Sequence, residues 1–444
     1  MIHPRRLYSQ HEGLTVSQLA GEPVRRSVGQ QANWLTGQPA NAIQTSERLM
    51  RKTSPLVIIF LTVFIDLVGF GMVLPVLPFY AEHYGATAYV IGLMATSYSF
   101  MQFLFAPLWG RLSDRVGRRP IIIMSLLGSA ISLAWFGLAT SLTGLFVSRM
   151  FAGTFAANIP TAQAYIADVT TSENRAKGMG LIGAAFGLGF IFGPSLGGLL
   201  SPYGFSVPSF VAAGLALANC VSAFFLLPES RRRQAVESSQ EHANQSRFNL
   251  RNLKVAFSHS LLRMFIILFF LLTFAFANME TTFALLTERL MNYGARENGY
   301  LFTYIGVLAA VVQGGLLGVL VRKFGESRLA TMGLVLLLIG FATLPYIHQL
   351  YSLLLSIAAI AVGYGVAQPS INSLISRHTD EDMQGGVLGI SQSFSSLARV
   401  LGPAWGGWVF DKYGVASPYL SGGIVLAGCV GLSVMAGMRL SSHD

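Results

Sequence analysis

The stretch GRLSDRVGRRP, residues 110–120, places five charged side chains between two long apolar runs. IGLMATSYSFMQFLFAPLW (91–109) precedes it, and IIIMSLLGSAISLAWFGLA (121–139) follows it. A run of about 18 or more apolar residues forms a helix long enough to cross roughly 30 Å of hydrocarbon. The stretch is therefore predicted to be a short charged loop that joins two membrane-spanning helices.

The whole chain has the composition of a membrane protein. Of its 444 residues, 52% are hydrophobic and 11% are charged, against roughly 25% charged residues in soluble domains. A segment that crosses lipid must pair its own backbone amides, so the apolar runs are predicted to be helices rather than strands. We expect an all-α integral membrane protein with transmembrane helices at 56–78, 88–109, 120–139, 142–166, 176–200, 208–227, 261–287, 298–321, 328–347, 350–374, 384–409 and 417–438.

The net charge of +10 is distributed unevenly along the chain. Lys and Arg gather in alternate loops, which would all lie on one side of the membrane, and few fall in the loops between them. This asymmetry is the positive-inside pattern, so the basic balance indicates topology rather than a nucleic-acid partner. We expect a multi-pass protein of the inner (plasma) membrane with both termini in the cytoplasm.

The predicted spans four to six match spans ten to twelve when the chain is shifted against itself by about 209 positions. GPSLGG (193–198) then meets GPAWGG (402–407), and Pro160 meets Pro369. Such ungapped agreement indicates a duplicated six-helix unit. We therefore expect the organisation 1–54 polar tail, 55–227 six-helix bundle, 228–260 cytoplasmic linker, 261–439 six-helix bundle and 440–444 cytoplasmic tail.

The remaining sequence gives little sign of other chemistry. The polar tail is predicted to be disordered, and an alternative is that translation starts at Met50, because MRKTSPLVIIF leads at once into the first span. Cys220 and Cys429 fall inside apolar runs and the eight histidines fall in tails or loops, so we expect no metal, cofactor or disulfide. The same positions offer no catalytic cluster, so we expect a protein other than an enzyme.

The charged loop resembles the signature of the major facilitator superfamily, Gly-x-x-x-Asp-Arg-x-Gly-Arg-Arg/Lys, which follows the second helix of that fold. The matching residues are Gly110, Asp114, Arg115, Gly117, Arg118 and Arg119. Two parallel six-helix halves are also the architecture of that superfamily. The resemblance implies the major facilitator fold, with twelve helices in two pseudo-symmetric bundles that can work as a monomer.

The resemblance also implies that the charged loop is a conformational latch. In the family, the aspartate at the position of Asp114 faces the amino end of the eleventh helix, where unpaired amides favour an anion. The arginine at the position of Arg118 pairs with an acid at the end of the fourth helix, which is Asp168 here. Together they would hold the two halves closed on the cytoplasmic side. The plain alternative is a loop whose positive charge determines topology alone.

Two further patterns resemble one branch of the superfamily. FIDLVGFGMVLPVLPFY (64–80) is similar to the first helix of the tetracycline-exporter-like group. GAAFGLGFIFGPSLGG in the fifth span is similar to the glycine-proline motif of the drug:proton antiporters, through Gly183, Gly187, Gly193, Pro194, Gly197 and Gly198. Glycines four apart let helices approach closely and a proline permits a bend, so ordinary tight packing would use the same residues.

Four ionisable side chains lie within predicted spans, at Asp66, Arg149, Glu280 and Arg399. A charge in mid-membrane costs roughly 2.5–3.5 kcal/mol even on the lenient insertion scale, so each is a candidate functional residue. Arg149 begins RMFAG, which resembles the Arg-x-x-x-Gly motif that takes part in proton transfer in the family.

We expect Asp66 to carry the proton, because a carboxylate that is alternately desolvated and paired with a guanidinium changes its affinity for protons. Arg149 would bias the ionisation of Asp66. Glu280 is the main alternative carrier, although it could also be a wetted residue at the outer rim. A static pair of Asp66 with Arg149 is the competing structural interpretation.

Polar side chains at helical spacing predict the lining of a substrate cavity, because apolar helices should turn such stripes away from lipid. The predicted lining is Tyr98, Gln102, Asn158, Phe186, Phe190, Asn278, Tyr304, Tyr364, Gln368, Asn372, Gln392 and Arg399. This mixed aromatic and amide surface suits amphipathic organic molecules. Each of these side chains could equally form a hydrogen bond to a neighbouring helix.

Together the resemblances imply a proton-coupled secondary active transporter that exports amphipathic drugs, tetracycline-like or multidrug, by alternating access. The alternative is a proton-coupled importer or exporter of a specific metabolite, such as a sugar or an organic acid, in the same fold. A membrane enzyme would need a catalytic cluster near one interface. A receptor would leave the charges inside the membrane without a purpose.

Overall fold

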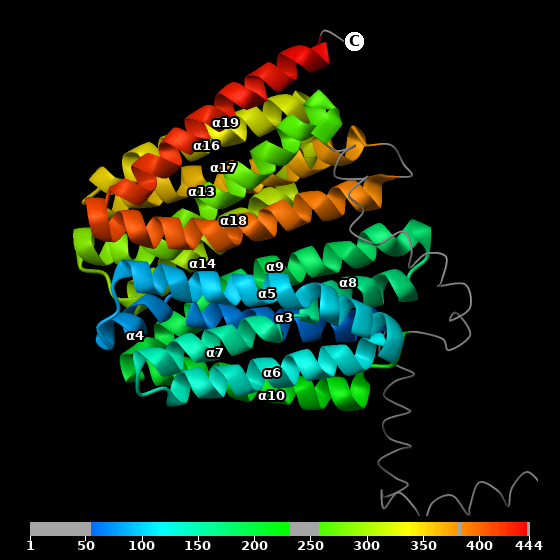
Figure 1. The fold of residues 1–444 in the computed structure, drawn as a ribbon, viewed down its shortest axis with the longest axis vertical. Coiled ribbons are helices and arrows are strands. Elements are labelled where there is room, and N and C mark those ends of the chain that lie inside the picture. Colours follow the sequence, from blue (N-terminus) through cyan, green and yellow to red (C-terminus); the bar gives the residue numbers. More distant parts are fainter. Residues whose placement is uncertain (1–54, 231–256, 380–382, 442–444) are drawn as a thin grey trace, which may run out of the picture. The chain divides into compact units, whose positions relative to one another are not determined.

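The computed structural model describes residues 55–230, 257–379 and 383–441, and the regular structure in these ranges is helical throughout. The described residues do not include Met50, the predicted N-terminal tail, residues 442–444 of the predicted C-terminal tail, or most of the linker. Figure 1 shows the helices lying side by side. They are α3 (Pro55–Val73), α4 (Leu77–His83), α5 (Ala88–Val116), α6 (Arg118–Leu138), α7 (Leu142–Thr154), α8 (Asn158–Val169), α9 (Ser172–Leu200), α10 (Ser206–Leu226), α13 (Ser260–Met291), α14 (Ala295–Val311), α15 (Leu317–Phe324), α16 (Glu326–Thr343), α17 (Leu350–Arg377), α18 (Gln384–Tyr413) and α19 (Ser417–Ser441).

Ten helical segments of the described residues are long and apolar enough to cross a membrane. Two further predicted spans are present in another form. The fourth is divided into the shorter helices α7 and α8, and the eleventh, α18, is long but carries several Gln, Ser and charged residues. The all-helical prediction is therefore confirmed for the described residues, and its twelve segments can be followed along the chain.

Proline explains where two of the predicted spans are interrupted. Pro75, between α3 and α4, and Pro78, in the first turn of α4, lack the amide hydrogen that a continuous helix needs. Between α7 and α8, Pro160 likewise leaves the turn before it without a helical donor. There Ser125 of α6 replaces the missing bonds, because its hydroxyl donates to the Phe155 carbonyl at 2.5 Å and accepts from the Ala157 amide at 3.2 Å.

The helices group into two sets of six spans. The contacts of α3 to α10 are mainly with one another, and those of α13 to α19 likewise, while α5 packs on α18 and α9 packs on α14 across the boundary (Figure 1). We call the end of the bundle that carries residues 110–120 the signature end, and the other the opposite end. These two helix pairs are therefore the main joints between the halves.

The two copies of the glycine-proline motif each pack on a helix of their own half. A Cβ at Gly197 would come within 2.2 Å of the Met72 carbonyl oxygen on α3. The corresponding Gly406 on α18 lies against Asn278 of α13. Glycine is required at both positions because any side chain would collide with the neighbouring helix.

The next glycine of each motif makes the contact between the halves. Gly198 of α9 lies against Gly299 of α14, and Gly407 of α18 lies against the Ala88 carbonyl of α5. Nearer the signature end the same helices separate, since a Cβ at Gly183 would meet no atom within 4 Å. The predicted packing of Gly183 is thus not made in this conformation, because the halves diverge toward the signature end.

The outward surface of the described helices is rich in large apolar side chains. Leu138, Leu355 and Ile424 are among many such residues that are exposed. Patches of this extent are rare on soluble monomers, and they fit a protein that is solvated by lipid tails.

Candidate functional site

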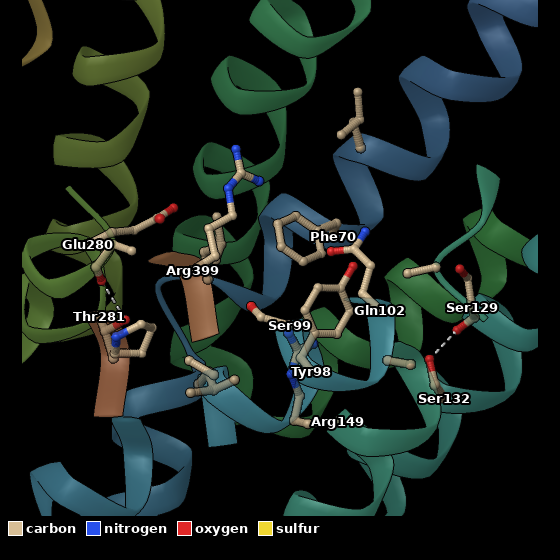
Figure 2. Close-up of a pocket in the computed structure, with 18 of the residues that line it drawn as sticks. Phe70, Tyr98, Ser99, Gln102, Ser129, Ser132, Arg149, Glu280, Thr281 and Arg399 are labelled. Carbon is tan, nitrogen blue, oxygen red and sulfur yellow. Dashed lines mark hydrogen bonds between the residues drawn. The ribbon is translucent and has the colours of Figure 1, made fainter. Parts of the chain in front are cut away.

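A cavity of about 250 Å³ lies between the two halves, and Figure 2 shows side chains that line it. Most of the lining comes from α3, α5, α6, α7 and α9, while α13 and α18 contribute one side. The lining includes these sequence-predicted residues: Asp66, Tyr98, Gln102, Arg149, Asn158, Phe186, Phe190, Glu280 and Arg399. The three predicted proton-coupling residues therefore share one space.

Arg149 is buried against aromatic rings rather than against an acid. Its side chain is 7% exposed, and the centre of its guanidinium lies 4.6 Å from the centroid of the Tyr98 ring and 5.9 Å from that of Phe70. Its Nε atom is buried and has no hydrogen-bond partner among the described residues. Aromatic faces stabilise a cation most when water is excluded, so Tyr98 and Phe70 hold this charge in the cavity wall.

Asp66 lies apart from that guanidinium. No ion pair within 4.0 Å joins Asp66 to Arg149 among the described contacts, and the Asp66 carboxyl lies beside the polar side chains of Asn158 and Ser129. The static salt bridge considered from the sequence is therefore not formed. Tyr98, Asp66 and Arg149 all line the same cavity, and the Tyr98 ring covers the Arg149 guanidinium.

The other half of the chain brings a second acid and a second base into the same space. Glu280 of α13 and Arg399 of α18 both project into the cavity in Figure 2, and they interact electrostatically without forming an ion pair within 4.0 Å. Arg399 is exposed. The cavity thus holds two acids and two bases, none of them paired with another within ion-pair distance among the described residues.

The other predicted cavity residues lie outside this lining. Asn278 is fully buried and donates a hydrogen bond from Nδ2 to the Pro418 carbonyl at 2.7 Å, so it joins α13 to α19. Tyr364 stacks on Phe276 with ring centroids 3.8 Å apart, and it interacts electrostatically with Arg399 and Glu280. The remaining four are partly or fully exposed elsewhere on the helices: Tyr304, Gln368, Asn372 and Gln392.

Several lining residues were not anticipated from the sequence, chiefly Phe70, Ser99, Ser129, Ser132 and Thr281. Phe70 lies four residues after Asp66, so helical spacing already placed it on the same face. The hydroxyl residues gave a weaker signal, because small polar residues are common where membrane helices pack.

The charged loop is held together within its own half. Arg118 donates from Nη1 to Asp114 at 2.6 Å and to Ser113 at 3.0 Å, and from Nε to Asp168 at 3.0 Å. The structure therefore has the pair of Arg118 with Asp168 that the resemblance implied. The described partner of Asp114 is Arg118 rather than the amino end of α18, because the halves diverge at this end.

Glu229, an acid that was not singled out from the sequence, supports the charged loop. The carboxylate of Glu229 accepts hydrogen bonds from the backbone amides of Arg118 at 2.9 Å and Arg119 at 3.2 Å. An acid is favourable there because the first amides of α6 are otherwise unpaired. Gly117 has φ +113°, and a Cβ on it would collide with this carboxylate. The only signal was an acid placed directly after the sixth span.

The described residues include no group of three or more His, Cys, Asp or Glu side chains that could hold a metal ion. The arrangement is instead a pair of six-span halves around a central cavity with unpaired charges. This is the general architecture of a secondary transporter.

Comparison with known proteins agrees with this class. The family model of the Major Facilitator Superfamily matches residues 59–403, and the chain belongs to this superfamily. It is similar to multidrug resistance protein 2 of Bacillus subtilis (strain 168), with 30% identity over 85% of this chain and 94% of the relative. It is also similar to the class H tetracycline resistance protein of Pasteurella multocida, with 30% identity over 84% of this chain and 93% of the relative.

A solved structure with the same arrangement is that of the human organic anion transporter MFSD10 (TETRAN). It superimposes with a TM-score of 0.64 and is 26% identical, over 85% of this chain and 98% of that one. The chain is therefore a multi-pass membrane transporter of the superfamily, and not an enzyme.

Proposed function

We propose that the protein exports amphipathic organic compounds, of multidrug or tetracycline-like type, across the plasma membrane in exchange for protons. The observation that carries this proposal is Asp66, an unpaired acid in a cavity that also holds a buried guanidinium and several aromatic rings. The names of the relatives, which are drug resistance proteins, support the substrate class.

In this proposal Asp66 is the group that takes up and releases the proton. Asn158 and Ser129 lie beside its carboxyl and Arg149 lines the same cavity, so a rearrangement that brings the guanidinium closer to the carboxyl would change the proton affinity of Asp66. Protonation from outside would weaken the binding of a substrate at the cavity, and deprotonation toward the cytoplasm would restore it. Glu280 is the alternative carrier, with Arg399 as its neighbour.

The conformational part of the proposal is a rocking of the bundles at 55–227 and 261–439 about the joints of α5 with α18 and of α9 with α14. We take the signature end to be cytoplasmic, with both termini on that side, and the protein to act as a monomer in the bilayer. The Arg118 cluster would then engage α18 through Asp114 when the signature end closes.

The test is proton release from energised inside-out vesicles, followed with a pH-sensitive dye while tetracyclines and lipophilic cations are added. Wild-type protein should let an active compound collapse the gradient, and Asp66→Asn should not. Glu297→Gln is the matched control, because this acid lies away from the cavity and bonds the Gly294 amide. It should respond like the wild type.

The outcomes separate the alternatives. If Asp66→Asn and the wild type respond alike, Asp66 is not the carrier and Glu280→Gln becomes the next variant. If drugs have no effect and a sugar or an organic acid does, the drug-export proposal fails in favour of a metabolite carrier.

A further inference from the structure

Two acids from different halves of the molecule meet at the opposite end of the bundle. Glu82, near the end of α4, and Glu288, near the end of α13, lie within hydrogen-bonding distance of each other. The neighbouring Arg289 lies with Nη2 3.5 Å from Oε1 of Glu82. This contact closes the space between the halves at the end remote from the signature loop.

The carboxyl pair is partly shielded from water. One oxygen of Glu288 is buried without a hydrogen-bond partner among the described residues, and the Glu82 side chain is 21% exposed. Beside the pair, apolar side chains of both halves pack into one cluster, including Leu77, Phe79, Ala284, Leu285 and Phe410. A charge at this place is therefore solvated less fully than one on the open surface.

The other ionisable groups at this end are engaged elsewhere. Asp411 accepts from the amides at the start of α5, and Glu297 accepts from the Gly294 amide. Lys412 lies over the ring of Trp408 at 5.1 Å, and Arg296 donates to the Tyr300 hydroxyl. His83 packs against the rings of Tyr84 and Phe205. Arg289, which is 60% exposed, is left as the neutralising partner of the two acids.

Two ionised carboxylates in hydrogen-bond contact repel each other strongly, and such pairs hold one proton between them. A single guanidinium that is mostly in water can offset only one of the two charges. We propose that Glu82 and Glu288 form a second proton-binding site, separate from the cavity, which takes up one proton when the opposite end closes.

The consequence is a gate that is driven by protons. When the halves part at this end, the two carboxyls separate, water solvates each of them, and the shared proton is released. The closed gate binds more protons than the open one, so acid favours closure, and the ratio of open to closed molecules changes by up to about tenfold per pH unit. The inference rests on the proposed function only in placing this end outside the cell. There, closure driven by external protons would return an empty exporter to the conformation that opens to the cytoplasm.

The experiment measures the gate directly and needs no substrate. Spin labels at Tyr203, between α9 and α10, and Tyr413, the last residue of α18, report the distance across the opposite end in lipid nanodiscs. Both positions are exposed, while the native Cys220 and Cys429 are buried and should stay unlabelled. The full chain carries Asp66→Asn and Glu280→Gln throughout, so that the acids of the cavity do not contribute.

In this background, acidification from about pH 8 to pH 5 should increase the closed fraction. Glu288→Gln should keep the gate closed over the whole range, because the amide donates a hydrogen bond to Glu82 without needing a proton. Glu82→Gln should act in the same way, so either variant is sufficient. Glu297→Gln should retain the response of the parent.

A pH response that is unchanged in both Gln variants would overturn the inference, as would a parent whose gate does not respond to pH. Neither result depends on whether drugs are transported. If the proposed drug export fails, the label experiment still tests the gate. If the gate fails, the role of Asp66 is still tested by the vesicle assay.

Discussion

Asp411, near the end of α18, accepts a hydrogen bond at 2.9 Å from the backbone amide of Tyr89, in the first turn of α5 in the other half. Its second oxygen accepts from the Ala88 amide at 3.1 Å. An acid of one half thus caps a helix of the other. Thr87 stands at the N-cap position with an extended backbone, yet its side chain makes no cap. Thr87 is therefore free to take over this role when Asp411 leaves.

We predict that Asp411→Ala shifts the gate at the opposite end toward the open state. Two amides lose their acceptor in the closed state only, and a cap of this kind contributes about 1 kcal/mol, which corresponds to an increase of roughly fivefold in the open-to-closed ratio. Asp411→Asn, which keeps an acceptor oxygen, should have a smaller effect. The label pair at Tyr203 and Tyr413 measures both at constant pH.

Thr87→Val should act in the opposite direction. It removes the substitute cap, which would be used only when the halves are apart, so the closed state should gain in population. Equal shifts of the same sign for Asp411→Ala and Thr87→Val would show that both residues merely stabilise α5, and would contradict the exchange of caps.

The glycines of α9 give a prediction that separates folding from transport. Gly197→Val should destabilise the protein strongly, because its Cβ would collide with the Met72 carbonyl on α3. Gly183→Val should leave thermal stability almost unchanged, since the space around Gly183 is open in this conformation. It should nevertheless slow transport if the halves approach there in the alternate state. A Gly183→Val protein with wild-type transport would show that this face never closes tightly.

Much of the fold could be predicted from the sequence, because each membrane helix appears as a long apolar run. The glycines of the duplicated motif also recur at matching positions in the two halves. The contact of Gly198 with Gly299 and that of Gly407 with Ala88 follow from small residues at fixed spacing. The break between α7 and α8 was missed, because its compensation lies in Ser125 on a different helix. A hydrogen bond between distant segments leaves no periodic trace in the sequence.

Ser125 itself provides a test of that compensation. We predict that Ser125→Ala lowers the free energy of unfolding by about 1 kcal/mol, because the Phe155 carbonyl and the Ala157 amide each lose a hydrogen bond to the hydroxyl and keep only the bond that joins them, at 2.7 Å. Ser222→Ala is the control, since that hydroxyl bonds only its own helix and is exposed. The free energies of unfolding of the two variants are compared by titration with denaturant in a mild detergent. An equal, small loss for both variants would mean that water replaces Ser125.

The site was predictable in its charges and less so in its contacts. Asp66, Arg149, Glu280 and Arg399 stood out because ionisable residues are rare in apolar spans. The rings that cover Arg149 and the meeting of Glu82 with Glu288 were not visible, because they depend on which helices become neighbours. Asn278 shows the converse, since a polar residue with the right spacing joins two helices instead of lining the cavity.

Tyr98 is the residue on which the proposed coupling can be tested most finely. Its ring covers the Arg149 guanidinium at 4.6 Å, and a desolvated contact of this kind is worth about 1–2 kcal/mol. Tyr98→Phe keeps the ring and should retain most of the transport rate. Tyr98→Ala exposes the guanidinium to water, weakens its influence on Asp66, and should reduce proton-coupled transport by roughly tenfold, the equivalent of 1.4 kcal/mol. The vesicle assay, with protein amounts matched by quantitative blotting, measures both variants. If Tyr98→Phe were as defective as Tyr98→Ala, the hydroxyl rather than the ring would be the active part, and Tyr98 would have to act on Asp66 by a hydrogen bond instead of through Arg149.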